Sequence, residues 1–146
     1  MIAAGIDVGI ASDGAACDNS MSMFGEMRLA GYLQSLAMGP GALPARTIVR
    51  MATRAGASAM GPGSETGSIE PGRRADLLLL DPRLPHSTGP EADPWTRIVY
   101  SMDARNVAGV WIDGARVLEE GRVRGLDAAE VAEEARVETA RLSGRA

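Results

Sequence analysis

The chain has a single cysteine, Cys17, and aromatic residues make up only 3% of its 146 residues. One cysteine excludes an internal disulfide and favours a reducing compartment, so we expect a cytoplasmic protein. Long apolar runs are also missing, and the longest is far too short to span a bilayer, so no membrane partner is expected. The N-terminus does not place a basic segment before a hydrophobic stretch, and we therefore expect no signal peptide.

Blocks of basic residues are absent as well. The net charge is -4, and the arginines are scattered among acidic residues rather than gathered with aromatic ones. This pattern argues against nucleic acid as the main partner, since a protein that binds nucleic acid needs a concentrated positive surface. What is present is 45% hydrophobic and 23% charged residues, the composition of an ordinary globular domain with a core of its own.

An alternating segment stands near the N-terminus. Ile6, Val8 and Ile10 alternate with small or acidic residues, a period of two that predicts a buried strand. On a regular strand, Asp13 would project from the small-residue face at the C-terminal end. A carboxylate there can bind a divalent cation or move a proton. Asp13-Gly14 is also common turn chemistry, so the residues alone leave both roles open.

Helices are predicted after this segment. Ser20 or Ser22 can cap a helix that Gly39 ends, and a second helix is expected to start at Pro44 and to end near Gly56. Beyond Gly61-Pro62-Gly63 the pattern changes to that of strands. The expected elements there are a strand over 75–80, strand candidates at 95–102 and 107–114, a hairpin turn at Asp113-Gly114 with a following strand, and a helix from Asp127 to about Leu142 whose apolar face includes Leu126, Val131 and Ala135.

The segment "SDGAACDNSMSMFGEMR" resembles the end of the catalytic barrel in the amidohydrolase superfamily, chlorohydrolase and deaminase branch, which includes 5-methylthioadenosine/S-adenosylhomocysteine deaminases. Residues 12–16, Asn19, Met23 and 26–28 match that pattern, whereas Cys17, Asp18 and Ser22 depart from it. The segments "MATRAGASAMG", "GSIEPGRRADLLLLD" and the stretch from Leu84 to Arg122 resemble later parts of the same family. The resemblance runs from about Ile6 to about Arg124.

This resemblance implies an α/β fold: a fragment of a metal-dependent TIM barrel (the last strand and helices), part of a small composite β-sandwich, and a C-terminal helix. The corresponding divisions are 1–62, 63–125 and 126–146. It also implies zinc or another divalent metal, with hydrolysis of a carbon–nitrogen (non-peptide) bond, such as deamination of a purine-like or triazine-like ring. In the family, the residue matching Asp13 is both a metal ligand and catalytic, and this role is expected of Asp13 alone.

The family's other metal ligands are histidines, and this chain has one histidine, His86, in a loop that is not a metal site in the family. One carboxylate cannot hold a catalytic zinc ion, which takes about three protein ligands. We therefore expect a C-terminal piece of such an enzyme, inert and poorly folded alone. The alternatives are a non-catalytic module, or one half of a split enzyme completed by another chain. Heterocyclic small molecules are the expected substrates, and a homo-oligomer is a further expected partner.

Other candidate residues are weaker. Cys17 is expected to be a packed thiol rather than a nucleophile, because no histidine lies near it in the sequence. The methionines are interpreted as core packing in preference to a pocket wall, and the paired glutamates as solvated faces. The glycines of "GPGSETG" lack the strand, helix and lysine of a phosphate loop. The residues in question are Met21, Met23, Met27 and Met38, with Glu119-Glu120 and Glu133-Glu134.

Overall fold

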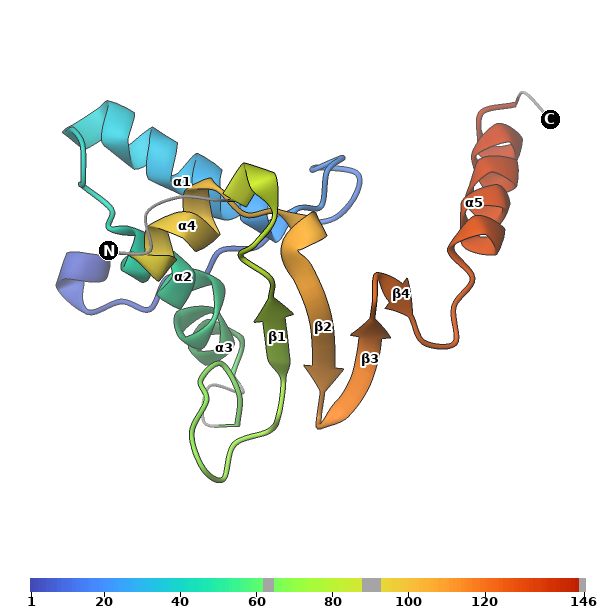
Figure 1. Ribbon diagram of the computed structural model, residues 1–146. Helices are drawn as coiled ribbons and strands as arrows, with labels where there is room; N and C mark the ends of the chain where they lie inside the picture. The colour runs from blue at the N-terminus through green and yellow to red at the C-terminus, as the bar shows by residue number, and fades with distance from the viewer. Residues whose placement is uncertain (62–64, 88–92, 145–146) are drawn as a thin grey trace.

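A cluster of helices packs against one end of a four-stranded antiparallel sheet, and a last helix stands beyond the far edge of that sheet (Figure 1). The structure is a computed structural model and describes residues 1–61, 65–87 and 93–144. Helix and sheet are both present, as predicted for an α/β chain. The predicted division at 62/63 lies outside the described residues, and the divisions 1–62, 63–125 and 126–146 stay a prediction.

The N-terminal segment begins with a short 3-10 helix, η1 (Ile2–Ala4), and then runs extended without forming a strand. The strand predicted around Ile6, Val8 and Ile10 was therefore wrong for this structure. An extended segment becomes a strand only when a neighbouring strand pairs with its backbone. The partner here is a helix instead: the Ile10 N–H donates to the Met51 carbonyl at 3.2 Å.

The first long helix, α1 (Met23–Met38), forms where the sequence predicted it. The Ser22 hydroxyl accepts a hydrogen bond from the Gly25 N–H at 3.2 Å and so satisfies one of the unpaired donors of the first turn. Gly39, with φ of 94°, ends the helix.

The second predicted helix is divided into α2 (Ala45–Ala52) and α3 (Arg54–Met60). The break lies at Thr53, whose hydroxyl donates to the Val49 carbonyl at 2.8 Å and competes with the backbone ladder. Gly56, predicted to end the helix, lies inside α3, and Gly61 (φ 103°) ends it instead. Gly9 and Gly56 bring their backbones close together, since a Cβ added to Gly9 would lie only 3.1 Å from the Gly56 Cα.

Residues 95–102 were predicted as a strand, and this was wrong: α4 (Pro94–Tyr100) occupies most of them. The Asp93 carboxylate accepts hydrogen bonds from the N–H groups of Trp95 (3.1 Å) and Thr96 (3.2 Å). Pro94 sits in the first turn, where its missing N–H costs nothing. The cap and the burial of Val99 outweigh the strand preference of the β-branched and aromatic residues.

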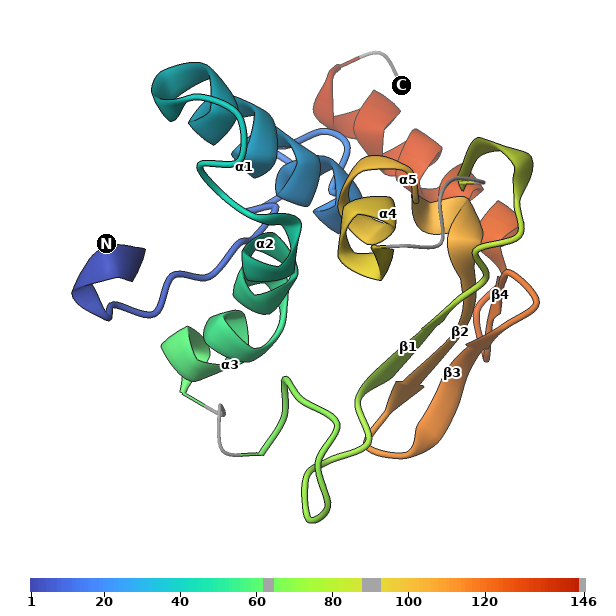
Figure 2. The same cartoon turned by 60° about the vertical axis from the view of Figure 1, so that its left-hand side comes forward.

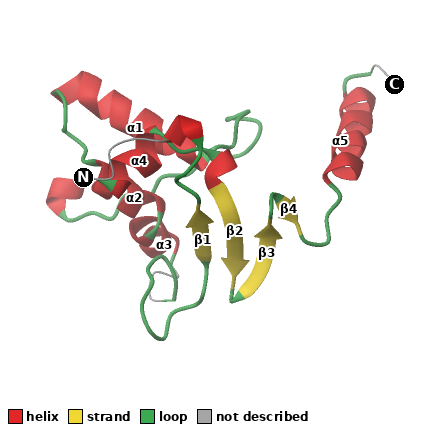
Figure 3. Ribbon diagram, viewed as in Figure 1, coloured by secondary structure: helices red, strands yellow, loops and turns green. Residues whose placement is uncertain are grey.

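The sheet has the order β1-β2-β3-β4, with every neighbouring pair antiparallel. Asp113 (φ 51°) and Gly114 (φ 80°) form the tight turn between the second and third strands, which confirms the predicted hairpin. Figure 3 shows the strands side by side. Their bounds are β1 (Leu77–Leu80), β2 (Val107–Ile112), β3 (Ala115–Glu119) and β4 (Arg122–Val123), so the predicted strands over 75–80 and 107–114 are confirmed in place and slightly shorter.

The hydrophobic core lies between α1, α2 and α4, whose ribbons lie close together in Figure 2. Ile48 and Val99 are fully buried at its centre. The other members are Phe24, Met27 and Met102, and Ile10 of the extended segment packs against them. This packing fixes the N-terminal segment against the helices.

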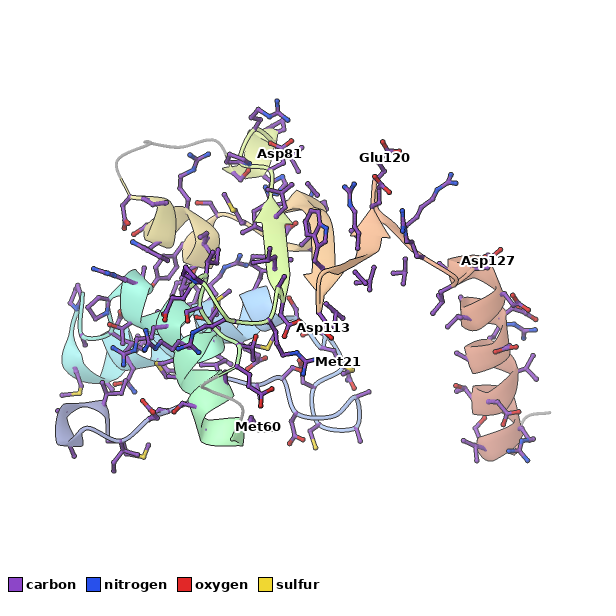
Figure 4. The ribbon with its side chains drawn as sticks, turned by 90° about the horizontal axis from the view of Figure 1, so that it is seen from below. Met21, Met60, Asp81, Asp113, Glu120 and Asp127 are labelled. Carbon is purple, nitrogen blue, oxygen red and sulfur yellow. The ribbon has the colours of Figure 1, made fainter. Side chains whose placement is uncertain are left out.

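The last helix, α5 (Ala128–Leu142), has the predicted bounds and the predicted cap, since the Asp127 carboxylate accepts from the Ala129 N–H at 2.8 Å. None of its residues is buried. Figure 4 shows Asp127 at its start, well away from the helical cluster. The predicted apolar face is therefore uncovered, and its Leu126 and Val131 are 51% and 45% exposed. No helix in the described part of the chain is long and apolar enough to cross a membrane.

Candidate functional site

Asp13 lies at the end of the extended segment, shortly before a turn over residues 15–17. Its backbone is left-handed (φ 59°), and its Oδ1 accepts a hydrogen bond of 2.8 Å from the N–H of Gly14. A turn follows, in which the Cys17 N–H donates to the Gly14 carbonyl at 2.8 Å. Asp13 thus precedes the turn and makes a local hydrogen bond, and its side chain is exposed rather than enclosed.

An open hollow of about 650 Å³ lies beside Asp13. Its walls come from the extended segment, the start of α1 and the region of α2 and α3, and they carry mostly methyl, methylene and thioether groups. The lining residues are Gly9, Ile10, Ala11, Ser12, Asp13, Met23, Ala52, Thr53, Gly56, Ala57, Ala59 and Met60. Asp13 is the one ionisable side chain among these described residues, so it is where a cation or a proton would be held.

The residues present do not fit a zinc ion by themselves. Within residues 1–61, 65–87 and 93–144, no three His, Cys, Asp or Glu side chains come together as a metal site would require. The acidic neighbour Asp18 is already engaged, since its Oδ1 accepts from the Ser20 N–H (3.0 Å) and hydroxyl (2.9 Å). The hydrogen bond from the Ser20 N–H is the main cause that lowers the pKa of Asp18. The described residues therefore do not complete a metal site at Asp13.

His86 takes no part in the hollow. It lies in a 3-10 turn, η2 (Pro85–Ser87), with its Nε2 3.0 Å from Asn106 Oδ1 and 3.6 Å from Asp103 Oδ1. Asn106 and Ser87 are fully buried, and the Asn106 amide donates to the Asp81 carbonyl (2.7 Å) and to the Ser87 hydroxyl (2.8 Å). His86 therefore belongs to a structural polar cluster. This cluster was not predicted from the sequence, although the spacing of Asp103 and Asn106 is that of a helix cap.

The weaker candidates are largely structural. Cys17 is exposed, so the prediction of a packed thiol was wrong. The methionines have mixed roles: Met27 is in the core, whereas Met21 and Met38 are 53% and 77% exposed, so core packing is confirmed for only part of the set.

The paired glutamates lie on the surface, as predicted. Glu119 pairs with Arg124 at 3.5 Å, and Glu133 pairs with Arg136 at 2.6 Å. Pro62–Ser64 of the glycine-rich stretch lie outside the described residues.

Comparison with known proteins shows a family match over most of the chain. The family model described as "Amidohydrolase family" matches residues 1–117. The 5-methylthioadenosine/S-adenosylhomocysteine deaminase of Syntrophomonas wolfei is 38% identical over 146 residues, covering 99% of this chain and 34% of its own length. The 5′-deoxyadenosine deaminase of Methanosarcina mazei is 37% identical over 146 residues, covering 99% and 33%. The chain thus spans about a third of the length of the curated relatives it matches.

Solved structures give the same result. The crystal structure of an adenosine deaminase from Xanthomonas campestris with bound zinc has a TM-score of 0.92 and 33% identity, over 98% of this chain and 33% of that chain. The zinc complex of atrazine chlorohydrolase from Arthrobacter aurescens has a TM-score of 0.84 and 27% identity, over 93% and 30%. The match over most of the sequence, together with these likenesses, shows that the chain belongs to the amidohydrolase family.

Proposed function

We propose that this chain forms part of a metal-dependent hydrolase that cleaves carbon–nitrogen (non-peptide) bonds and deaminates a purine-like or triazine-like ring. The observation that carries the proposal is the match to deaminases over 99% of the chain at 37–38% identity. Two structural neighbours are named as an adenosine deaminase and an atrazine chlorohydrolase, and both of these structures contain zinc. The substrate proposed is therefore a small heterocycle, and the metal is zinc or another divalent ion.

Asp13 is the residue proposed for both the metal-ligand and the catalytic role. Its position supports this role, since its carboxylate is accessible and borders an apolar hollow large enough to face a planar ring. The remaining ligands would come from residues beyond those that the structure describes, because no group of three or more His, Cys, Asp or Glu side chains gathers among the described ones. In this proposal the extended segment is the last strand of a barrel, which forms only when its neighbours are present.

The test exchanges segments between relatives. The Syntrophomonas wolfei deaminase would be made with its matching segment replaced by these 146 residues, and zinc content and deamination of 5-methylthioadenosine would be measured. We expect zinc-dependent activity, and in the same chimera Asp13→Asn should lower kcat/KM by at least about 100-fold, because a metal ligand and proton acceptor is lost. Asp18→Asn is the matched control, since Asp18 is an acid of the same loop that is engaged by Ser20.

Two results would contradict the proposal. A folded, zinc-loaded chimera without activity would refute the hydrolase role. An Asp13→Asn chimera as active and as rich in zinc as its parent would refute the role of Asp13.

A non-catalytic module is the second candidate, favoured by the local hydrogen bond that Asp13 makes with Gly14. In that case the Asp13→Asn change would alter stability and leave the chimera's zinc content unchanged. A homo-oligomer and a cytoplasmic location stay predictions from the sequence.

A further inference from the structure

The break between α2 and α3 depends on the side chain of Thr53. In an uninterrupted α-helix, the Val49 carbonyl would accept a hydrogen bond from the N–H of Thr53, four residues later. Here the Thr53 hydroxyl donates to that carbonyl at 2.8 Å, and the Thr53 N–H donates to the Arg50 carbonyl at 3.3 Å. The hydroxyl thus replaces one backbone hydrogen bond of the helix, and the Thr53 backbone is not helical (φ -125°, ψ -98°).

The break makes the Met51 carbonyl available to a partner outside the helices. In an uninterrupted helix its partner would be the N–H of Ala55. It accepts a hydrogen bond of 3.2 Å from the N–H of Ile10, in the extended segment. Ile10 lies three positions before Asp13 in the chain. The break therefore supplies the acceptor that holds the segment leading to the proposed catalytic carboxylate.

Two glycines allow the extended segment and α3 to approach each other at the same point. A Cβ on Gly9 would lie 3.1 Å from the Gly56 Cα, and a Cβ on Gly56 would lie 3.0 Å from the Met51 carbonyl oxygen. Glycine is the default residue at such close backbone approaches. Both distances are shorter than an ordinary van der Waals contact, so an added methyl group would push the Met51 carbonyl or the segment that it binds.

The break and Asp13 border the same hollow, since Asp13, Thr53 and Gly56 are all among its lining residues. Each residue of an extended chain spans about 3.3 Å, so a shift at Ile10 reaches Asp13 over a short distance. The Asp13 backbone is left-handed (φ 59°), a conformation that persists only where the surroundings hold it. A misplacement of about 1 Å at a reacting group costs about 100-fold in rate. The anchoring of Ile10 therefore matters for chemistry at Asp13.

We propose that Thr53 is a positioning residue for Asp13 and acts through the Met51 carbonyl and the Ile10 N–H. The inference rests on the proposed function, in which Asp13 is a metal ligand and catalytic. The Thr53 hydroxyl maintains the helix break, and the break directs the Met51 carbonyl toward Ile10. The hydrogen bond to Ile10 then fixes the segment that ends at Asp13.

The experiment compares Thr53→Val, which keeps the branched shape without the hydroxyl, with Thr53→Ser, which keeps the hydroxyl. In the segment-exchange chimera, Thr53→Val should lower kcat about tenfold or more and leave KM within about twofold, because it displaces the reacting carboxylate and not the ring site. Thr53→Ser should restore most of kcat. Thr139→Val is the matched control, since the Thr139 hydroxyl donates to the carbonyl of Ala135, four residues earlier, at 2.7 Å on the distant α5.

A second measurement needs no activity. In the chain of 146 residues, Thr53→Val should speed hydrogen exchange of the Ile10 amide about tenfold, the effect of about one lost backbone hydrogen bond. It should also shift the NMR signal of the Gly14 amide, which donates to Asp13 Oδ1 at 2.8 Å. Thr53→Ser and Thr139→Val should leave both signals as in the wild type.

Gly56→Ala is a second variant for the case in which Thr53→Val does not fold, as circular dichroism would show. Its methyl group would press on the Met51 carbonyl, while the higher helix propensity of alanine opposes unfolding. We expect the same loss of kcat and the same faster exchange of the Ile10 amide. Gly25→Ala, whose Cβ would meet Ser22 at an ordinary 3.5 Å, is its control.

An Ile10 amide that is unprotected in the wild type, or whose exchange both Thr53→Val and Gly56→Ala leave unchanged, would overturn the inference. Faster Ile10 exchange with an unmoved Gly14 signal and an unchanged kcat would show that Thr53 only stabilises the helices, and would overturn it as well. An inactive wild-type chimera would count against the proposed function, and the two amide signals would still decide whether Thr53 positions Asp13.

Discussion

The guanidinium of Arg28, on α1, donates a hydrogen bond of 2.9 Å from Nη2 to the carbonyl oxygen of Met102. Its Nε donates to the Val99 carbonyl at 3.3 Å. Both acceptors lie at the C-terminal end of α4, where helix carbonyls lack partners and the helix dipole favours a positive charge. Arg28 therefore joins two helices that are far apart in the sequence, and its place in the family pattern has a structural reason.

We expect Arg28→Met to lower the free energy of unfolding by about 2 kcal/mol, because it leaves partly buried carbonyls without a charged donor. The free energy of unfolding of Arg28→Lys should lie between those of the wild type and Arg28→Met, since an ammonium group cannot donate from two nitrogens as the guanidinium does. Arg50→Met, an exposed arginine on α2, is the control. Urea unfolding of the three variants measures the effect, and an equal loss for Arg28→Met and Arg50→Met would contradict this role.

Gly31 and Gly25 lie on the same helix and should respond oppositely to alanine. A Cβ at Gly31 would overlap the Tyr100 hydroxyl and lie 3.1 Å from Ile48 Cδ1, whereas a Cβ at Gly25 would meet Ser22 at an ordinary 3.5 Å. Gly31→Ala should cost about 1–3 kcal/mol from overpacking, despite the better helix propensity of alanine. Gly25→Ala should be neutral or stabilising by up to about 1 kcal/mol.

The double variant Gly31→Ala with Tyr100→Phe locates the strain at Gly31. Removing the hydroxyl should restore part of the lost melting temperature. If Tyr100→Phe gives no recovery, the hydroxyl is not the obstacle.

Asn106 should tolerate substitution poorly. Its Nδ2 donates two hydrogen bonds, and its Oδ1 accepts from the Asp103 N–H at 3.0 Å, all in a fully buried position. Asn106→Asp places a carboxylate against the Asp81 carbonyl, and we expect a loss of about 3 kcal/mol or more. The exposed Asn19→Asp change is the control, followed by thermal unfolding. Equal losses of stability for Asn106→Asp and Asn19→Asp would show that the buried hydrogen bonds of Asn106 do not stabilise the fold.

Acid stability should depend on Asp81. Hydrogen bonds from the Arg83 side chain, then from its backbone N–H, lower the pKa of Asp81 from 3.8 to about 2. A carboxyl whose pKa is lower in the folded state stabilises the fold fully above the unfolded value of 3.8, and this contribution is lost as the pH falls toward about 2. The stability difference between the wild type and Asp81→Asn should therefore shrink over that range.

Unfolding midpoints of both proteins across acidic pH measure this difference, with Glu134→Gln, an exposed acid on α5, as the control. A difference that stays constant with pH would contradict the assignment to Asp81.

Local chemistry predicted much of the fold. The caps at Ser22 and Asp127 and the turn at Asp113-Gly114 act within a few residues, and the elements they define are where we expected them. The prediction for residues 95–102 was wrong because most of their side chains favour strands. The helix cap at Asp93 has the opposite effect, and the periodicity of the side chains does not reveal it. The prediction around Ile10 failed for another reason: the pattern is that of a strand, but none of the described strands pairs with this segment.

The candidate site divides in the same way. Asp13 was proposed as a site residue from the resemblance and from its position after an alternating segment. The hollow beside it could not be predicted, because its walls come from segments that only the fold brings together. The cluster around Asn106 could not be read locally, since its bonds to Ser87 and Asp81 join residues 19 and 25 positions apart.

The lack of any buried residue in α5 sets how that helix melts. With no tertiary packing to make its unfolding cooperative with the core, α5 has only its Asp127 cap and its own ion pairs to hold it. A 15-residue helix of this kind is close to marginal in water. On warming, the helical ellipticity of α5 is therefore expected to decline gradually, as that of an isolated peptide does. The rest of the fold should unfold in a steeper, cooperative transition.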